Sequence, residues 1–586
     1  MVKRRDKTLM CDNNPFVKIQ SIKFKGFDER FTFNEDDIVL FVGANNAGKS
    51  RTLKDIRDKM LNTQADLVLI ENIQFNEYNF KFECIKRYME ENLKIDSNGS
   101  YTVMSEDNCN PCYDLNYIRS ILGDNSINYD MYNNRYSLYR LFYVFLSTEN
   151  RLNLTKPIIL NYSPDNQTLN VFNKLRNGRE SILKVNELLN ISFGKGIEVC
   201  DPEIDSNAQF KYKIGNAEEI ENIINSNRRD VYDELKKFPD LYDQGDGIRS
   251  AVAILSSLVV NKSFLYFIDE PETFLHPPQA RQLGRDIAHL SEGKQCFIAT
   301  HNIDFIRGVL EAGSKRVKII KINRNENTNQ YFCLNNEDIK NIAEDKNLKF
   351  SNILNGLFYK KVIICEDETD CKFYSTILEA VSPEKYQNTL FCAVGGKDQF
   401  KKVIPLLEGL KIDYAIVADL DLINDKDKLK QLLNSIDGNC YNQIAEQHAE
   451  FLKEFEEGTN SQVKKQSEIK EEIREIFDNA KSDEYMSDET AKNIRKSLKR
   501  INDYALLKSG GTSNIPNGAC MTKYREIHNY LKENHIYLVE CGEIENFIPT
   551  VEGHGGKWVE CVFEQYEDLN NCEFDKAKEF VKSIVE

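Results

Sequence analysis

A ten-residue stretch, Phe41 to Ser50, has the pattern of a phosphate-binding loop. It fits G-x-x-x-x-G-K-[S/T] without a mismatch. In such a loop, backbone N–H groups surround the phosphates, the lysine reaches the β- and γ-phosphates, and the serine hydroxyl binds Mg²⁺. We therefore expect ATP and Mg²⁺ as cofactors. The candidate binding residues in the loop are Gly43, Asn46, Gly48, Lys49 and Ser50.

Two acidic residues that could act together with this loop on a bound nucleotide follow a second apolar run. Phe264 to Ile268 is expected to be a buried strand, and Asp269 and Glu270 follow it directly. Asp269 could hold Mg²⁺ through water, and Glu270 could polarise the water that attacks the γ-phosphate. His301 follows a further predicted strand, 295–300, and could contact the same phosphate. Upstream, Gly245 and Gly247 form a glycine-rich turn before a predicted helix, 251–260, which is an anion site by geometry. Taken alone, the pattern favours the alternative, a helix N-cap turn that binds no ligand.

The second half of the chain contains another group of carboxylates. Glu366 follows a predicted strand, 361–365, and Asp419 and Asp421 follow another, 413–418. The carboxyl ends of parallel strands meet at one edge of a sheet, where ligands bind. A group of hard oxygen ligands there suits Mg²⁺ or Mn²⁺. Acidic residues in solvated turns are the alternative.

The elements that position these residues follow from apolar patterning. A first strand is expected over 17–27, with a bulge where the alternation slips, and 31–33 pairs with it. The phosphate-binding loop lies between a strand, 38–42, and a helix, 50–60. Helices are expected over 78–93, 136–145 and 179–189, and strands over 158–160 and 210–214. In the second half, strands alternate with helices, which indicates a small parallel sheet. Its further elements are a helix over 368–380, a strand over 390–394, a last strand over 535–539 and a terminal helix over 574–585.

Length and composition narrow the protein class. A chain of 586 residues should hold two or three domains. No apolar run is long enough to span a bilayer, and the basic first ten residues lack the apolar segment of a signal peptide. Fifteen cysteines, mostly isolated, suit reduced thiols. Cys109 and Cys112 have C-x-x-C spacing but no second pair, which favours incidental thiols over a zinc site. We expect a cytoplasmic protein without a membrane partner.

The first half resembles the ABC-type ATPase head of SMC and RecF-like proteins. The resemblance rests on the motif order and on the run Glu270-Pro271-Glu272-Thr273-Phe274-Leu275-His276-Pro277. It implies that two heads enclose ATP, each phosphate-binding loop facing the partner's signature turn. Gly245-Asp246-Gly247 stands where that turn usually has Ser-Gly-Gly, which puts fast hydrolysis in doubt but not binding.

The second half resembles the TOPRIM domain, with Glu366 as its first-strand Glu and Asp419 and Asp421 as its D-x-D. Asp367 replaces the usual glycine after the Glu. An ABC-type head followed by TOPRIM resembles the overcoming-lysogenization-defect (OLD) nucleases, including Gabija-type and retron-associated phage-defence effectors. The resemblance implies an α/β fold with an ATPase domain over 1–355 and a TOPRIM nuclease domain over 356–586, the latter carrying a helical insertion over about 425–530.

The OLD resemblance also implies further catalytic residues. Asp370 would join the metal-binding acids. A C-terminal Glu would be Glu545, with Glu543 as the second choice, and a catalytic Lys would be Lys557, with Lys508 as the second choice. An ordinary surface charge is an equally good interpretation of either lysine.

A net charge of −16 means that DNA contacts must be concentrated on part of the surface. Within the insertion, helices are expected over 444–455, 462–480 and 490–507, and 509–512 is expected to be a flexible return loop. Arg495, Lys496, Lys499 and Arg500 recur at helical spacing and are the candidate DNA-binding residues. A solvated helix face is the alternative interpretation of this stripe.

Three functional hypotheses follow. The first is an ATP-binding, metal-dependent DNA endonuclease of antiphage defence that forms a homodimer or tetramer through its ATPase domain. The second is a DNA-repair or structural-maintenance ATPase whose TOPRIM domain binds DNA without cutting it. The third is an effector held inactive by a partner, such as a retron reverse transcriptase with its msDNA or another defence-operon protein.

Overall fold

The computed structural model forms two units, residues 1–345 and 346–586, and the first ends ahead of the predicted boundary at 355. The structure describes residues 14–62, 65–95, 100–102, 112–122, 136–159, 171–200, 209–225, 231–261, 263–325, 328–334, 339, 352–459, 465–479, 486–498, 503–566 and 568–586. Cys109 lies outside these ranges. No helix within them is both apolar enough and long enough to cross a membrane.

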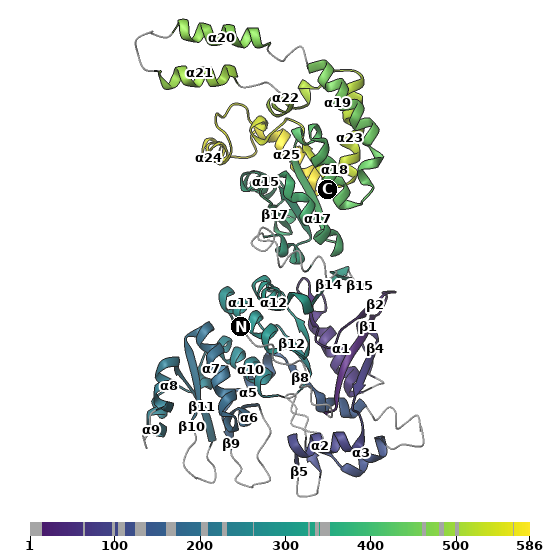
Figure 1. Cartoon of the computed structure of the whole chain (residues 1–586), viewed down its shortest axis with the longest axis vertical. Coiled ribbons are helices and arrows are strands. Elements are labelled where there is room, and N and C mark those ends of the chain that lie inside the picture. Colours follow the sequence, from purple (N-terminus) through teal and green to yellow (C-terminus); the bar gives the residue numbers. More distant parts are fainter. Residues whose placement is uncertain are drawn as a thin grey trace, which may run out of the picture. The chain divides into compact units, whose positions relative to one another are not determined.

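A six-stranded sheet of order β15-β14-β3-β13-β12-β8 forms the centre of the first unit (Figure 1). All its strands are parallel except β15. β3 and β13 are buried along their whole length, which explains the uninterrupted apolar sequence of β3 and the apolar run 296–299 of β13. The strands are β3 (Ile38–Val42), β8 (Tyr143–Leu146), β12 (Leu265–Asp269), β13 (Gln295–Ala299), β14 (Val317–Asn325) and β15 (Thr328–Cys333).

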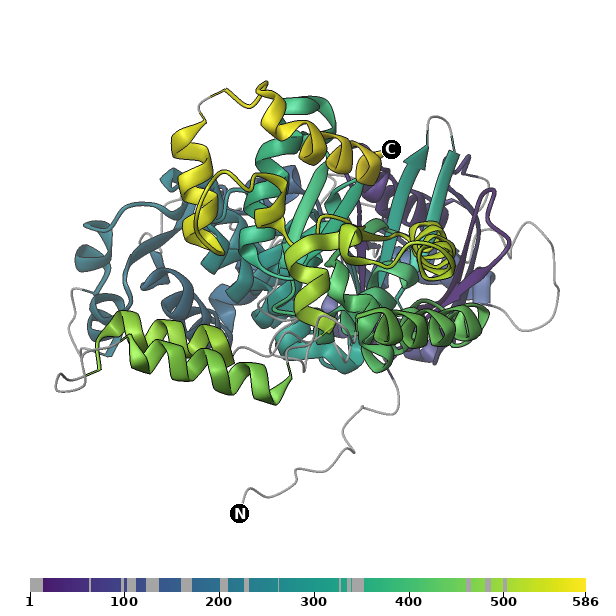
Figure 2. The same ribbon diagram turned by 90° about the horizontal axis from the view of Figure 1, so that it is seen from above.

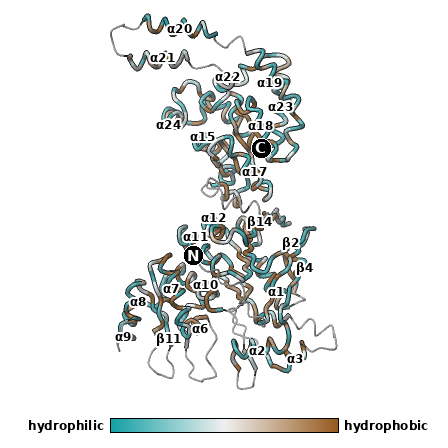
Figure 3. Tube along the Cα trace, viewed as in Figure 1, coloured by the Kyte–Doolittle hydropathy of each residue, from teal (hydrophilic) through white to brown (hydrophobic). Residues whose placement is uncertain are grey.

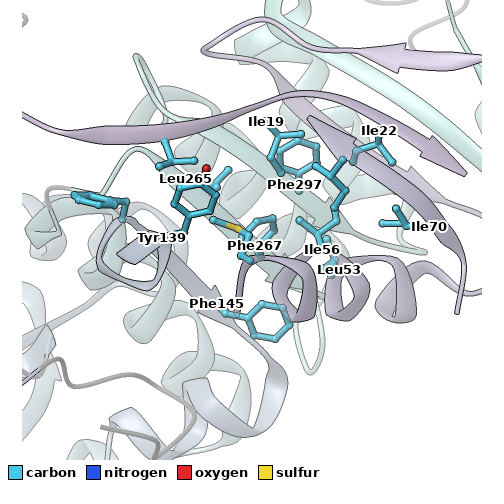
Figure 4. Packing of buried hydrophobic residues seen from close by; sticks show 14 of the residues in the cluster. Ile19, Ile22, Leu53, Ile56, Ile70, Tyr139, Phe145, Leu265, Phe267 and Phe297 are labelled. Atoms are coloured by element: carbon cyan, nitrogen blue, oxygen red, sulfur yellow. The ribbon is translucent and has the colours of Figure 1, made fainter. Parts of the chain in front are cut away.

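A second, antiparallel sheet of order β2-β1-β4 packs with helix α1 against this centre. Its strands are β1 (Phe16–Phe24), β2 (Arg30–Thr32) and β4 (Ile70–Tyr78), and α1 spans Lys49–Leu61. The predicted bulge is confirmed, because the pairing of β1 with β4 shifts between Ile19 and Ser21. Figure 4 shows Leu53 and Ile56 of α1 among Ile19, Ile22 and Ile70 of the antiparallel sheet and Phe267 and Phe297 of the central one. This core fixes the helix that follows the phosphate-binding loop.

Two of the helices predicted in the first unit are wrong in part. Tyr136–Phe142 is a short 3-10 helix, and the remainder of the predicted helix 136–145 becomes β8, which pairs with β12. Its aromatic and β-branched residues suit a strand once a neighbouring strand is available, which a local pattern cannot show. Tyr78 ends β4, so the helix expected over 78–93 begins only with α2 (Phe82–Asn92).

The remaining elements of the first unit surround these sheets. The small sheet β10-β11-β9 and the small sheet β5-β6-β7 are peripheral. Their strands are β5 (Lys94–Ile95), β6 (Tyr101–Thr102), β7 (Cys112–Tyr113), β9 (Ile158–Ile159), β10 (Lys195–Cys200) and β11 (Gln209–Asn216). The helices are α3 (Leu115–Leu122), α5 (Thr148–Leu154), α6 (Val171–Asn177), α7 (Arg179–Phe193), α8 (Ala217–Asn225), α9 (Val231–Lys236), α10 (Asp246–Val260), α11 (Pro277–Leu290) and α12 (Ile303–Gly313).

A four-stranded parallel sheet of order β17-β16-β18-β19 forms the centre of the second unit. Its strands are β16 (Lys361–Cys365), β17 (Thr389–Ala393), β18 (Asp413–Asp419) and β19 (Ile536–Val539). Helices α15 (Glu368–Val381), α16 (Pro383–Gln387), α17 (Phe400–Gly409), α24 (Gly556–Gln565) and α25 (Asp575–Val585) accompany it. Since β16 and β18 are hydrogen-bonded neighbours, their carboxyl ends bring the predicted acids together.

Helices fill the chain between β18 and β19. They are α18 (Lys426–Ile436), α19 (Ala445–Thr459), α20 (Gln466–Asp478), α21 (Asp488–Leu498), α22 (Asp503–Gly510) and α23 (Ala519–Glu533). α20 and α21 run side by side (Figure 1, Figure 2), and Figure 3 shows hydrophilic residues along most of both helices. The helix predicted over 490–507 is wrong in extent, because α21 ends at Leu498 and α22 begins at Asp503.

The flexible return loop predicted over 509–512 is also wrong. Gly510 ends α22, and Gly511–Asn514 forms a 3-10 helix. The Thr512 amide donates to the Glu540 carbonyl at 2.9 Å. A Cβ on Gly511, whose φ is +57°, would lie 2.3 Å from that same carbonyl oxygen. Here the glycines permit close backbone packing, a role that the sequence pattern does not distinguish from that of a mobile linker.

The packing of α11 on α12 yields a stability prediction. A Cβ on Gly308 would lie 1.9 Å from the Arg281 carbonyl oxygen, so Gly308→Ala must force the two backbones apart. We expect it to lower the free energy of unfolding by about 1–3 kcal/mol, even though alanine favours helices. Urea unfolding of the whole chain measures this. Gly438→Ala is the control, because a Cβ there meets nothing within 4 Å. Equal stability of the two variants would contradict the prediction.

Candidate functional site

The phosphate-binding loop joins β3 to α1. Gly43, Asn46 and Gly48 have φ angles of +151°, +63° and +103°. A Cβ on Gly43 would lie 2.3 Å from the Ile322 carbonyl oxygen of β14, so this position requires glycine. Lys49 is almost fully buried, and its ammonium donates to the carbonyls of Gly43 and Ala44, both at 2.9 Å. The lysine is therefore held within the curve of the loop.

Ser50 and Asp269 meet beside this lysine. The Ser50 hydroxyl donates to Asp269 Oδ1 at 2.7 Å, across 219 residues of sequence. Burial raises the pKa of Asp269. This hydroxyl and this carboxylate meet at the N-terminus of α1, next to the lysine. Together they supply oxygen ligands that fit the Mg²⁺ of a bound nucleoside triphosphate.

Glu270 and His301 lie together at the ends of β12 and β13. His301 Nδ1 is 3.5 Å from Glu270 Oε1, and this interaction raises the pKa of the imidazole and lowers that of Glu270. Glu272, 3% exposed, accepts the Thr300 hydroxyl at 2.8 Å and the His301 amide at 3.1 Å. The buried Glu272 carboxylate thus fixes the backbone that presents His301.

Arg151 connects this site to the glycine-rich turn. It is fully buried on α5 and donates to the Ser250 hydroxyl of α10 at 2.8 Å and to the Glu270 carbonyl at 2.9 Å. It also donates to the carbonyls of Asp269 and Leu146. Burial lowers the pKa of Arg151 to about 10, so the side chain stays charged at neutral pH. One guanidinium thus connects α10 to the backbone of the acidic strand end.

The glycine-rich turn opens α10. Gly245 is its N-cap, and a Cβ there would meet nothing within 4 Å. A Cβ on Gly247 would lie 2.5 Å from the Phe274 carbonyl oxygen. The turn therefore packs against the segment that follows Glu272, while the start of α10 remains accessible at Gly245.

The acids of the second unit form one group. The Asp419 amide donates to Glu366 Oε1 at 3.2 Å, and the side chains of Glu366, Asp419 and Asp421 are 20%, 18% and 11% exposed. Burial is the largest cause that raises the pKa of Glu366, to about 7, and of Asp419, and the neighbouring carboxylates raise both further. Such a group of carboxylates is stabilised by cations.

Two lysines lie against these acids. The Lys397 ammonium pairs with Asp421 and lies 3.4 Å from Glu366. Gly395 and Gly396 bring it there with φ angles of +80° and +109°, and both of their amides donate to the Glu366 carbonyl, at 3.0 and 2.9 Å. The Lys508 ammonium lies 3.3 Å from Asp419 and 3.9 Å from Asp421.

Backbone contacts hold Lys508 in place. Its carbonyl accepts the Asn546 side-chain amide at 2.6 Å, and a Cβ on Gly542 would lie 2.2 Å from that carbonyl oxygen. The Gly542 carbonyl in turn accepts the Leu420 amide at 3.2 Å, inside the Asp419–Asp421 turn. The returning end of the helical insertion is therefore packed directly on the acidic turn.

Asp370 belongs to the acidic group electrostatically. Burial raises its pKa to about 8, with further contributions from Asp367, Asp419 and Glu366. Asp367, in the usual place of a glycine, is the N-cap of α15 and accepts the amides of Thr369 and Asp370. The extra acid therefore has a structural role at the start of this helix.

The other predicted catalytic residues do not all lie against the acidic group. The Glu543 carboxyl interacts electrostatically with Asp419 and Lys508, whereas the Glu545 carboxylate accepts the Gly555 amide at 2.7 Å and lies 2.7 Å from His554 Nδ1. Lys557 is exposed on α24 and makes no ion pair with any described residue. Of the two candidate lysines, Lys508 is the one that contacts the acids.

The proposed basic stripe is described only in part. Arg495 and Lys496 fall on α21, and Lys499 and Arg500 lie outside the described residues. The stripe remains a prediction.

Two domain families match the chain. Residues 146–307 match the family described as "AAA domain, putative AbiEii toxin, Type IV TA system". Residues 357–421, from the start of the parallel sheet to Asp421, match the family described as "Overcoming lysogenization defect protein-like, TOPRIM domain". The chain carries an OLD-like TOPRIM domain. The predicted fold class, an ABC/RecF-like ATPase domain followed by TOPRIM, and the predicted resemblance to the OLD family are both confirmed.

Two curated relatives share part of the sequence of this chain. It is 23% identical over 338 residues to the Old nuclease of Escherichia phage P2, a match that covers 55% of this chain and 50% of that protein. It is 24% identical over 228 residues to endonuclease GajA of Bacillus cereus (strain VD045), covering 38% of each protein. The chain thus spans half or less of the length of these relatives.

Solved structures match about half of the chain at low similarity. An Smc head bound to the C-winged helix domain of ScpA gives a TM-score of 0.34 at 14% identity, covering 54% of this chain and 98% of that one. The SMC head domain from Thermotoga maritima gives a TM-score of 0.26 at 14% identity, covering 55% of this chain and 99% of that one.

Sequence reasoning missed three residues of these sites. Glu272 lies within the recognised run 270–277, so the sequence contained a signal for its role. Lys397 follows two glycines at a strand end, which is a weak signal. Arg151 has no local signal, because its partners Ser250 and Asp269 lie 99 and 118 residues away.

Arg151 can be tested by stability. Arg151→Met keeps much of the side-chain length but leaves three buried carbonyls and the Ser250 hydroxyl without their donor. We expect a loss of about 3–5 kcal/mol, the range for breaking a buried charged network. Thermal unfolding measures it, with Lys184→Met as the control, because both side chains of the Lys184–Glu187 ion pair are exposed. A Tm for Arg151→Met within a degree or so of the control would contradict this assignment.

The acidic group of the OLD-like domain predicts a pH-dependent effect of metal. Raised carboxyl pKa values mean that the folded state binds more protons than the unfolded chain. The contribution of these acids to the stability of the metal-free protein should therefore fall as pH rises from about 4 through 7–8. A divalent cation binds the deprotonated form. We expect Mg²⁺ to raise Tm more at about pH 8 than at about pH 6, and Asp419→Asn to reduce that difference. An equal effect at both pH values would contradict the assignment.

Proposed function

We propose that the chain is an ATP-binding, divalent-metal-dependent DNA endonuclease. The observation that supports this most is the convergence of Glu366, Asp419 and Asp421 at neighbouring strand ends with Lys508 paired to them. The names of the partly matching relatives, a nuclease and an endonuclease, agree with it.

The acids would hold the cations of the reaction. Glu366, Asp370, Asp419 and Asp421, with Glu545 from the C-terminal segment, supply carboxylate oxygens, the ligands that Mg²⁺ and Mn²⁺ prefer. Such cations activate water and stabilise the leaving oxygen of a phosphodiester. Lys508 places a positive charge where charge develops on the phosphate. Lys557, the lysine preferred from the sequence, would have to act from the exposed surface of α24.

The first unit would bind ATP and control the second. Lys49, Ser50 and Asp269 would bind the phosphates and their Mg²⁺, and Glu270 and His301 would contact the γ-phosphate. Arg151 joins Ser250 of α10 to the carbonyl of Glu270, so a change at the glycine-rich turn reaches the acidic strand end through one side chain. Assembly through this unit and a cytoplasmic role in antiphage defence complete the proposal, and both derive from the family resemblance.

Plasmid cleavage tests the proposal. The wild-type chain should nick or cut plasmid DNA with Mg²⁺ or Mn²⁺, and Asp419→Ala should lower the rate by at least about a hundredfold, since even supporting residues of metal sites cost 10–100-fold. Lys508→Met should lower it on the order of a hundredfold. Lys557→Met discriminates between the two lysines and should have a much smaller effect.

Nucleotide control is measured in the same assay. Lys49→Ala should make the cleavage rate insensitive to ATP, because the phosphates lose their main cationic partner. Cleavage that Asp419→Ala leaves unchanged would refute the nuclease assignment. Absence of cleavage by the wild type in every metal and nucleotide condition would favour the partner-held effector or the DNA-binding ATPase.

A further inference from the structure

His448 is a buried histidine of the helical insertion that contacts the segment carrying the acids. It lies on α19, and its side chain is fully buried. One imidazole nitrogen, Nε2, is 2.6 Å from the Ile423 carbonyl oxygen, and the other, Nδ1, is 2.9 Å from the Tyr441 hydroxyl. Both ring nitrogens therefore have a hydrogen-bond partner within the second unit.

These two partners define the tautomer of the imidazole. A carbonyl oxygen can only accept a hydrogen bond, so Nε2 must carry a proton. In a neutral ring Nδ1 is then an acceptor, and the Tyr441 hydroxyl donates to it. Burial lowers the pKa of His448, which favours this neutral form. The ring thus donates to Ile423 as a defined tautomer that Tyr441 selects.

Ile423 belongs to the short helix that carries Asp421. This 3-10 helix, Leu420–Asn424, follows β18 directly. Its first amide, that of Leu420, donates to the Gly542 carbonyl at 3.2 Å, and the Ile423 carbonyl near its other end accepts from His448. Asp421 lies between these two hydrogen bonds. The backbone that presents its carboxylate is therefore held on one side by the segment after β19 and on the other by α19.

The position of this carboxylate matters for cation binding. Mg²⁺ demands near-ideal octahedral geometry, so a small displacement of one ligand lowers its affinity. Residues that orient the ligands of a metal without contacting the metal change its affinity by about 10–100-fold when they are replaced. Without the imidazole donor, the buried Ile423 carbonyl would be left unpaired, which is costly and favours a shift of the helix that carries Asp421.

We propose that His448 is a positioning residue for the acidic group: its hydrogen bond to the Ile423 carbonyl fixes Asp421 and thereby sets the affinity of the group for a divalent cation. Through this bond, helix α19 of the insertion controls that affinity. The consequence for DNA cleavage rests on the proposed nuclease function. The consequence for cation binding does not, so the two can be tested separately.

Two amide substitutions separate this hydrogen bond from the packing of the ring. In His448→Gln, the side-chain amide nitrogen can take the place of Nε2 and donate to Ile423. In His448→Asn, the shorter amide reaches only the place of Nδ1, next to Tyr441. Both substitutions remove volume from a buried site, so both should lower Tm. Only His448→Asn should lose the bond to Ile423.

Titration of the nucleotide-free chain with Mn²⁺, followed by the EPR signal of the free ion, measures the affinity. Asp419→Ala identifies the Mn²⁺ sites that belong to the acidic group. His448→Asn should weaken those sites by at least about tenfold, and His448→Gln should stay within about threefold of the wild type. Wild-type affinity in His448→Asn, or equal losses in the two variants, would overturn the proposal.

Phe455→Leu is the matched control. Phe455 lies about two turns further along α19, is 1% exposed and stacks on Phe451. Its side chain has no hydrogen-bonding group, so the substitution removes buried volume from the same helix and leaves the bond to Ile423 in place. It should lower Tm and keep the Mn²⁺ affinity. A loss of affinity as large as that in His448→Asn would mean that any destabilisation of α19 weakens the site, and the specific role of His448 would be overturned.

¹⁵N NMR of the imidazoles tests the tautomer. The chain has seven histidines, and the resonances lost in His448→Gln belong to His448. They should show a protonated Nε2 and an unprotonated Nδ1. A proton on Nδ1 alone would remove the donor to Ile423 and overturn the proposal.

These outcomes are independent of cleavage. A chain that cuts no DNA but loses Mn²⁺ affinity in His448→Asn would support the role of His448 and refute the nuclease proposal. A chain that cuts DNA, and whose Mn²⁺ affinity is unchanged in His448→Asn, would do the reverse.

Discussion

Repulsion between carboxylates at the ends of parallel strands is the constraint on which both units depend. Parallel strands point their carboxyl ends in one direction, so acids placed there must share one edge of a sheet. In the first unit these acids are Asp269 and Glu270, and in the second Glu366 and Asp419. In each group, cationic side chains from other segments of the chain offset this repulsion. Lys49 and Arg151 do so in the first unit, and Lys397 and Lys508 in the second.

The two units place these cations differently, and the difference matters for chemistry. Arg151 is fully buried and bonds to backbone carbonyls, so it holds the strand end in shape and does not compete for its carboxylates. Lys397 and Lys508 contact the carboxylates themselves. Where a divalent cation shares those oxygens, the lysines must either yield or turn toward an anionic substrate. Under the proposed function, binding of metal by these acids would therefore release positive charge for the phosphate.

Local patterns were sufficient for the central strands and for the acids at their ends. β3 is a continuous apolar run, and β12, β16 and β18 each contain one. A buried parallel strand has few other sequence solutions. The wrong predictions concern segments whose structure depends on contacts with another segment of the chain. Tyr143–Leu146 becomes a strand because β12 lies beside it, and Gly511 is packed closely against the backbone carbonyl of Glu540. Arg151 could not be found because a buried arginine is defined by partners about a hundred residues away.

The same reasoning explains why Lys508 lies at the end of a long insertion. A lysine on β18, or in the turn that follows this strand, would be held as firmly as Asp419 and Asp421. Lys508 instead comes from α22, which precedes α23 and β19, and its carbonyl accepts a hydrogen bond from the Asn546 side-chain amide. Gly542 is packed against that carbonyl and accepts the amide of Leu420, between the two aspartates. Any displacement of the insertion that moves α22 must therefore move both the lysine and the segment carrying Glu543. The charge balance of the acidic group is mechanically coupled to the helices that precede it.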